Sequence, residues 1–296
     1  MNRRQKYRPL PVVIYTILLL YVPGIFTPIL AAERPGLHQN TPKKTAYFTH
    51  RLKLSTIGGI ASIGAGIAIA FSIDEVNRNP VIGGPNGLDR YFRNRLRATG
   101  KTSNFLDHRG TYYTLAGSVG GMIFLQRMLK DGPYWRDAAY EVMVFGVGLM
   151  TEVGLRIAVK TSFARRRPLL EFADPLNSAT LNTNPKNHLS FYSGHASTAF
   201  YTAAYADQKI GDLLRARDLQ RYRLLSILAL YSWASYMAFS RIEIDKHYFS
   251  DVFTGGLVGT AWGIWHYRYH HSTRNGWTVL PAFDGERVGV MVGWAY

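Results

Sequence analysis

The 296-residue chain contains no cysteine, which excludes disulfide bonds, thiolate nucleophiles and zinc sites with cysteine ligands. Acidic residues are scarce as well, because 19 Asp and Glu stand against 35 Lys and Arg, giving a formal net charge of +16. This excess favours anionic partners such as phosphorylated substrates, acidic lipid surfaces or nucleic acid. The basic residues are spread along the chain and no nucleic-acid-binding motif accompanies them. We therefore expect no nucleic-acid partner.

The first 32 residues are typical of an export signal or an N-terminal anchor. Four basic residues precede position 9, an almost wholly apolar stretch covers 10–25, and Ala31-Ala32 supplies small residues near a cleavage point. The residues three positions before the two candidate cuts, Ile29 and Leu30, are larger than a signal peptidase prefers. The sequence thus leaves cleavage open, and we place residues 1–32 outside the folded domain.

Six further apolar segments predict helices. They are approximately 54–73, 111–128, 140–159, 194–206, 224–239 and 252–267. Several are rich in Gly and Ala, which allows helices to approach closely. We predict an all-α domain over residues 33–275 that consists of a bundle of about six core helices. Only the segment 54–73 approaches the ~20 uncharged residues needed to span a bilayer, so the sequence leaves the number of membrane spans open.

The C-terminal residues 276–296 have a different pattern. Trp277–Phe283 and Val288–Tyr296 are β-like and flank Asp284-Gly285, a residue pair suited to a tight turn. In the second run, alternate residues share one face, as in a half-buried strand. These features predict a short C-terminal β-hairpin that caps the bundle.

Three short segments carry the polar residues that hydrolysis of a phosphate ester requires. They are Lys160–Pro168, Ser193-Gly194-His195 and Ser240–Asp251. The phosphate oxygens need fixed positive donors, the phosphorus needs a nucleophile, and the departing oxygen needs a proton. Arg167 and Arg241 offer planar guanidinium forks.

Lys160 adds a compact third positive charge. Ser193 and Gly194 precede a predicted helix, whose first backbone N–H groups and the serine hydroxyl suit the remaining phosphate oxygens. Gly194 has no side chain to keep the backbone away from the phosphate. These residues together predict a phosphate-binding site.

The spacing of His247 and Asp251 predicts a histidine–carboxylate pair. Residues four apart on a helix lie on one face, within hydrogen-bonding reach. A carboxylate on one ring nitrogen fixes the tautomer and leaves the other nitrogen to attack phosphorus. His195 is then available to protonate the leaving oxygen.

In this order and spacing, the three segments resemble the signature of the type 2 phosphatidic acid phosphatase family, which shares its fold with the vanadium-dependent haloperoxidases. The resemblance covers about residues 110–270. It implies that His247 is a nucleophile forming a phosphohistidine, that Asp251 orients it, and that His195 is the general acid. The phosphate-binding residues that it implies are Lys160, Arg167, Ser193, Gly194 and Arg241. It implies no metal and no cofactor, since the cations neutralise the charge that a metal ion would otherwise meet.

One residue departs from the family pattern, which usually has proline before Ser-Gly-His. Here Tyr192 occupies that position. Because proline stiffens the backbone, we expect tyrosine to leave the start of the helix freer and to add a hydroxyl near the pocket. Arg165 and Arg166 are expected to contact substrate or lipid headgroups.

The function predicted from the sequence is a metal-independent phosphatase that acts on a phosphomonoester or diphosphate, foremost of a lipid. We expect it in the cell envelope, associated with a membrane surface and with its site facing the periplasm or exterior. A smaller soluble phosphoester is the other substrate class. Two alternatives stay open: a vanadate-dependent haloperoxidase that uses the same pocket, and a non-catalytic protein that binds anionic lipid through its basic loops.

Overall fold

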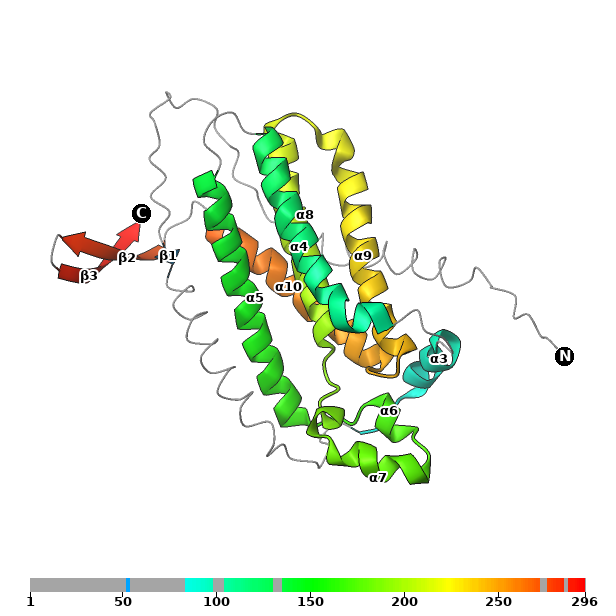
Figure 1. Ribbon diagram of the computed structural model, residues 1–296. Helices are drawn as coiled ribbons and strands as arrows, with labels where there is room; N and C mark the ends of the chain where they lie inside the picture. The colour runs from blue at the N-terminus through cyan, green and yellow to red at the C-terminus, as the bar shows by residue number, and fades with distance from the viewer. Residues whose placement is uncertain are drawn as a thin grey trace.

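Five long helices form the body of the described part of the chain. The computed structural model describes residues 52–53, 83–97, 104–129, 135–271, 276–284 and 287–295. The long helices are α4 (Asn104–Leu129), α5 (Trp135–Phe163), α8 (Gly194–Ala216), α9 (Arg223–Glu243) and α10 (Phe249–His271). Figure 1 shows α4, α5, α8 and α9 side by side, with α10 crossing behind them. The prediction of a helical bundle is confirmed, whereas the apolar segment 54–73 lies outside the described residues.

Helix α8 is the centre of the bundle, and it packs most extensively on α10. Three glycines of α10 at four-residue spacing, Gly255, Gly259 and Gly263, face α8. A Cβ atom added at Gly259 would lie 2.2 Å from the backbone oxygen of Ser197, so no larger residue fits there. The absence of side chains lets the two backbones touch. This contact sets the first turn of α10 directly against the first turn of α8.

The other side of α8 contributes to an apolar core shared with α9. Its buried residues include Ala199, Phe200 and Ala203 from α8 and Ala234, Met237 and Ala238 from α9. Small residues predominate in this core, as expected where helices approach closely. Within the described residues, one stretch, Glu141–Glu171, is long and apolar enough to cross a membrane.

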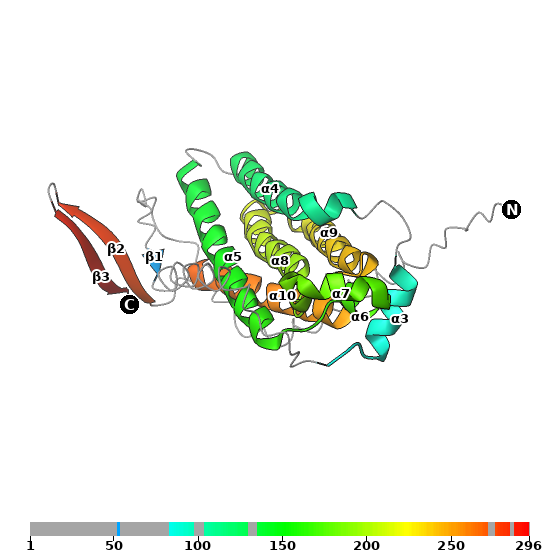
Figure 2. The same ribbon diagram turned by 60° about the horizontal axis from the view of Figure 1, so that its bottom comes forward.

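Short elements gather at one end of the bundle. They are α3 (Gly87–Leu96), α6 (Pro168–Glu171), α7 (Pro175–Thr183) and the 3-10 turn η3 (Pro185–His188), while the turn η4 (Gln220–Tyr222) links α8 to α9. Figure 2 shows α3, α6 and α7 together at this end. No helix was predicted from the sequence over 87–96. Helix α3 begins there with a capping box, in which the side chains of Asn86 and Asp89 each accept a hydrogen bond from the other's backbone amide. Such a box can start a helix that has no long apolar stripe.

The three strands lie apart from the helices. β1 (Leu52–Lys53), β2 (Gly276–Asp284) and β3 (Arg287–Ala295) form an antiparallel sheet in the order β1-β2-β3, with Trp277 opposite Trp294. Figures 1 and 2 both show the sheet to one side of the bundle rather than over its end. The prediction of a C-terminal β-hairpin that caps the bundle is therefore not supported. Gly285 and residues 1–32 lie outside the described residues.

Candidate active site

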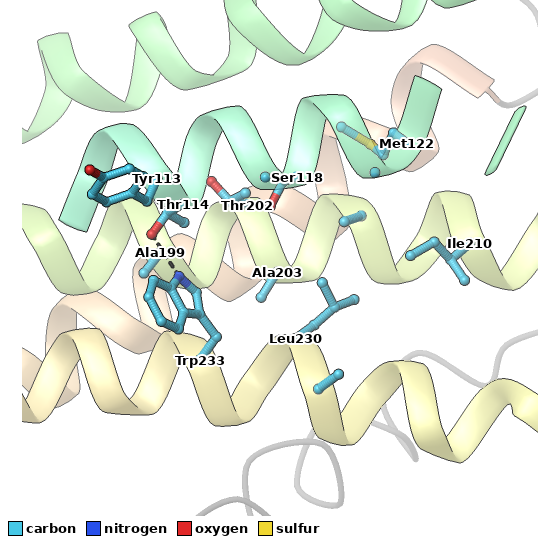
Figure 3. A pocket seen from close by; sticks show the side chains of 14 residues that line it. Tyr113, Thr114, Ser118, Met122, Ala199, Thr202, Ala203, Ile210, Leu230 and Trp233 are labelled. Atoms are coloured by element: carbon cyan, nitrogen blue, oxygen red, sulfur yellow. Dashed lines mark hydrogen bonds between the residues drawn. The ribbon is translucent and has the colours of Figure 1, made fainter. Parts of the chain in front are cut away.

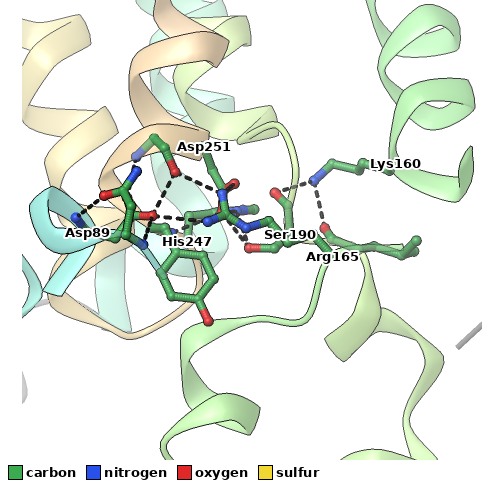
Figure 4. Close-up of polar contacts among 10 residues, drawn as sticks. Asp89, Lys160, Arg165, Ser190, His247 and Asp251 are labelled. Atoms are coloured by element: carbon green, nitrogen blue, oxygen red, sulfur yellow. Dashed lines mark hydrogen bonds and ion pairs between the residues drawn. The ribbon is translucent and has the colours of Figure 1, made fainter. Parts of the chain in front are cut away.

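The three predicted segments meet at the end of the bundle where α8 and α10 begin. Lys160 is in the last turn of α5, and its Nζ donates to the backbone oxygens of Leu189, at 2.8 Å, and Ser190, at 3.3 Å. The amide of Ser193 donates to the backbone oxygen of Asp251 at 3.0 Å. Arg165 of the first segment also donates to Asp251 of the third at 2.6 Å, so each segment is held to another by hydrogen bonds. Figure 4 shows Lys160, Arg165, Ser190, His247 and Asp251 around one region.

His247 and Asp251 are close, and a third residue, Ser190, contacts both of them. His247 precedes α10 by two residues, and its Nδ1 is 3.8 Å from Asp251 Oδ2. Ser190 Oγ donates to the same Oδ2 at 2.6 Å and lies 3.5 Å from His247 Nδ1. At 3.8 Å the two side chains form a long i,i+4 pair, and the hydroxyl of Ser190 provides a second contact to each of them. Ser190 was not predicted from the sequence, because nothing in its spacing marks a serine three residues before Ser193.

The second oxygen of Asp251 is bound by Arg165. Arg165 Nη1 donates to Asp251 Oδ1 at 2.6 Å, and Nη2 donates to Asp89 Oδ2 at 3.0 Å. Arg165 is only 4% exposed and Asp89 is fully buried. The expectation that Arg165 contacts substrate is therefore wrong, since two carboxylates occupy its guanidinium inside the protein. Arg166 is exposed to solvent.

Asp89 brings α3 into the site. Its Oδ1 accepts from the amide of Ser250 at 2.8 Å, and its Oδ2 also accepts from the Ser250 hydroxyl at 3.0 Å. Asp89 thus holds the first turn of α10 as well as Arg165. The only signal in the sequence was the capping box Asn86-x-x-Asp89, which explains a helix start but not a partner 161 residues away.

The pKa values of the pair reflect these surroundings. Burial, followed by the positive charges of Lys160 and Arg167, holds the pKa of His247 well below its ordinary value, although Asp251 opposes the shift. Burial alone would raise the pKa of Asp251, but His247, Arg165 and the Ser190 hydrogen bond lower it overall. At neutral pH the imidazole is therefore neutral and the carboxylate ionised.

The predicted phosphate ligands surround this pair. Arg241 is almost fully buried at the end of α9, and its Nε and Nη2 both donate to Ser240 Oγ at 3.1 Å. Arg167 is half-buried directly before α6, and its amide donates to the Asn187 oxygen at 2.8 Å. Ser193 is the N-cap of α8, and His195 is half-buried in the first turn. The arrangement gathers cations, a helix N-terminus and two imidazoles at one end of the fold.

The side chain of Tyr192 is buried and hydrogen-bonded. Its side chain is 3% exposed, and its hydroxyl donates to Glu152 Oε1 at 3.3 Å. The hydroxyl that we expected near the pocket thus bonds to a buried carboxylate, which argues against a freer start of α8. Glu152 is likewise buried, in the middle of α5.

Parts of the chain are similar to known proteins. Residues 141–274 match the PAP2 superfamily. The chain is 35% identical over 74 residues to a putative phosphatidate phosphatase of Drosophila melanogaster, covering 24% of this chain and 19% of that protein. It is 25% identical over 171 residues to a dihydrosphingosine 1-phosphate phosphatase of Schizosaccharomyces pombe, covering 56% of this chain and 39% of that protein. The chain thus spans less than half the length of either relative.

A solved structure is also similar. It is a transmembrane PAP2-type phosphatidylglycerolphosphate phosphatase from Bacillus subtilis, with 15% sequence identity and a TM-score of 0.45. The match covers 73% of this chain and 97% of that protein.

Proposed function

We propose, from the premise that residues 141–274 make this chain a member of the PAP2 superfamily, that it is a phosphoric ester hydrolase acting on a phosphorylated lipid. The observation that carries the proposal is the meeting of Lys160, Arg167 and Arg241 with the His247–Ser190–Asp251 group at the N-terminus of α8. Positive donors for the phosphate and a neutral, oriented imidazole are the two requirements of phosphoryl transfer without a metal ion.

The geometry supports Nε2 of His247 as the attacking atom. His247 Nδ1 faces Ser190 Oγ and Asp251 Oδ2, so Nδ1 carries the proton and Nε2 carries the lone pair. In the proposed first step, Nε2 forms a bond to phosphorus as the bond to the leaving oxygen breaks. Protonated His195 gives its proton to that oxygen. The phosphoryl group is then held on His247 while the alcohol, or the shortened phosphate, departs.

Water completes the cycle. His195, now neutral, accepts a proton from a water molecule as the water oxygen attacks phosphorus. The N–P bond breaks, inorganic phosphate is released, and His195 is again protonated. Lys160, Arg167, Arg241 and the first amides of α8 bind the phosphate oxygens through both steps. Because these groups are fixed before the reaction, they stabilise the charge in the transition state without reorganising.

A groove next to the site supports a substrate with an apolar chain. It has a volume of about 290 Å³ and lies between α4, α8 and α9, as Figure 3 shows. Ala199, Thr202 and Ala206 line it, and these residues follow His195 at helical spacings of 4, 7 and 11 along the same face of α8. We propose that a lipid chain lies in this groove while its phosphate is at His247.

The remaining assignments are proposals of the same kind. Residues 1–32 serve as signal or anchor, residues 33–275 form the phosphatase domain, and residues 276–296 form a separate β segment. The protein associates with a membrane of the cell envelope, with the site on its outer face. The Glu141–Glu171 stretch and the net charge of +16 support attachment to a bilayer with anionic lipids.

A phosphate-release assay tests the proposal. The full chain is incubated with phosphatidic acid, an isoprenoid diphosphate, a sphingoid-base phosphate and a soluble aryl phosphate, with and without chelator. We expect release that vanadate inhibits and that the chelator leaves unchanged. Release no faster than buffer would favour the lipid-binding alternative. Bromination of a dye in the presence of vanadate, bromide and peroxide would favour the haloperoxidase.

A further inference from the structure

A second buried polar group lies behind the phosphate site, on the α5 side of α8. Arg156, one turn before Lys160, points its Nη1 at the start of α8. This atom lies 3.0 Å from the Gly194 oxygen, 3.1 Å from Ser197 Oγ and 3.0 Å from Thr198 Oγ1. A Cβ atom added at Gly194 would lie 3.0 Å from Arg156 Nε. The guanidinium thus lies directly against the residue that we assign to the phosphate.

Glu152 joins this guanidinium to the residue on the other side of Ser193. Its Oε2 accepts from Arg156 Nη1 at 3.0 Å, and its Oε1 accepts from the Tyr192 hydroxyl at 3.3 Å. Glu152 is 1% exposed. Burying a carboxylate destabilises the fold unless both of its oxygens accept hydrogen bonds. The two partners of Glu152 are therefore held tightly.

The three side chains therefore fix both ends of a two-residue segment. Tyr192 anchors the residue before Ser193-Gly194, and Arg156 binds the carbonyl of Gly194 and the hydroxyls of Ser197 and Thr198 one turn further along α8. Within this segment the Ser193 amide is bound by the Asp251 backbone oxygen at 3.0 Å, whereas the direction of the Gly194 amide is set by the backbone alone, since Gly194 has no side chain. Any rotation of the segment would move the Gly194 amide away from the phosphate.

We propose that Tyr192, Glu152 and Arg156 are positioning residues that hold Ser193, Gly194 and His195 in place, in the role that proline has in the family pattern. This inference rests on the proposed function. The three residues do not exchange protons or bonds with the substrate in this account. They act through the α8 N-terminus, where a displacement of about 1 Å lowers the rate about 100-fold.

Three conservative variants test the inference with the soluble aryl phosphate. Tyr192→Phe removes one hydroxyl, Glu152→Gln removes the charge, and Arg156→Lys keeps the charge but loses the planar fork. We expect kcat to fall about tenfold to 100-fold in each, with KM within about twofold of the unmodified chain, because the displaced groups act in the transition state. The kcat of the Tyr192→Phe/Glu152→Gln double variant should be no lower than that of the less active single variant, since both changes disrupt the same hydrogen bond.

The matched control is Tyr201→Phe. Tyr201 also lies on α8, is fully buried, and donates its hydroxyl to α5, at the Phe145 oxygen, 2.8 Å away. This hydrogen bond joins α5 and α8 about two turns from the site. We therefore expect removal of the Tyr201 hydroxyl to lower the melting temperature but not kcat.

Each outcome has a defined meaning. Unchanged kcat in folded Tyr192→Phe and Glu152→Gln would overturn the inference alone. A fall in kcat proportional to the fall in melting temperature in every variant, including Tyr201→Phe, would also overturn the inference. It would indicate that these residues have only a general structural role. No turnover by the unmodified chain would overturn the proposed function and this inference with it.

Discussion

Arg165 donates to Asp251 Oδ1 at 2.6 Å while it also holds Asp89, so the carboxylate beside His247 is fixed by a residue that comes from outside the α8–α10 core. The connection runs from Asp89 on α3 through Arg165 to Asp251, and from Asp251 through Ser190 to His247. The ring of Tyr248 covers the guanidinium, with Arg165 Cζ 4.3 Å from its centroid. A site built this way depends on side chains that no motif includes.

Replacing the nucleophile is the most direct prediction. We expect His247→Ala to lower kcat for the aryl phosphate at least about 1,000-fold, because nothing else in the proposed mechanism can form the bond to phosphorus. Phosphate release and trapping of an acid-labile phosphoprotein are the measurements. His271→Gln, which removes an imidazole at the far end of α10, is the control and should retain activity. Wild-type turnover by His247→Ala would refute the role.

Asp89→Asn should affect stability and rate together. Arg165 would keep a buried positive charge with one of its two carboxylates removed, and breaking a buried pair in this way costs about 3–5 kcal/mol. We expect a lower melting temperature and a lower kcat, because Arg165 no longer fixes Asp251. In the control, Arg215→Gln breaks the exposed Arg215–Asp212 pair, which is worth less than about 1 kcal/mol. Equal melting temperatures for the two variants would contradict the prediction.

The hydroxyl of Ser190 should matter for the rate but not for binding. Ser190→Ala removes the donor to Asp251 and the group next to His247 Nδ1, so the imidazole loses its fixed orientation. We expect kcat to fall about tenfold or more with KM unchanged, in line with typical general-base geometry effects. Ser178→Ala removes an exposed hydroxyl on α7 that bonds only the Pro175 oxygen, and it serves as the matched control. A change confined to KM would argue that Ser190 touches substrate instead.

The pH dependence follows from the lowered pKa of His247. Attack requires the neutral imidazole, so kcat/KM should stay constant as pH falls through about 6.5, the ordinary histidine value, and should decline only at lower pH. Lys160→Met removes one of the positive charges that lower this pKa, so the acidic decline should move to higher pH. A decline that stays in place in Lys160→Met would show that another group titrates.

The same shift affects folding with a definite sign. Because the pKa of His247 is lower in the folded chain than in the unfolded chain, the unfolded chain takes up the proton first. The contribution of His247 to stability is therefore complete above about pH 6.5 and is lost progressively as pH falls below that value. Thermal unfolding between pH 5 and 8 should show this loss in the unmodified chain, and to a smaller extent in His247→Ala.

Filling the groove should separate lipid from soluble substrates. Gly117 lines the groove, and a Cβ atom added there would meet nothing within 4 Å. We expect Gly117→Leu to lower kcat/KM for a long-chain phosphatidic acid about tenfold and to leave the aryl phosphate unaffected. Gly120, on the same helix, has equally open surroundings but does not line the groove, so Gly120→Leu is the control. Equal effects of the two variants on the lipid would remove the groove from the proposed function.

The sequence by itself predicted the five long helices and the residues with phosphate chemistry, because both depend on local order. Apolar segments of helical length predicted α4, α5, α8, α9 and α10, and fixed spacings identified Lys160, Ser193, His195 and His247. The proximity of His247 and Asp251 was also predicted from their spacing, although His247 lies two residues before α10 and does not share a helical turn with Asp251.

The tertiary structure alone decided which side chains hold those residues in place. Asp89, Ser190 and Arg156 became site residues because packing of α3, α5 and α8 brings them there, and no local pattern encodes contacts between distant segments. It also decided that Arg165 and Tyr192 are buried partners of carboxylates rather than solvent-facing groups. Burial is a property of the assembled helices, and the chemistry of an ionisable side chain changes with it.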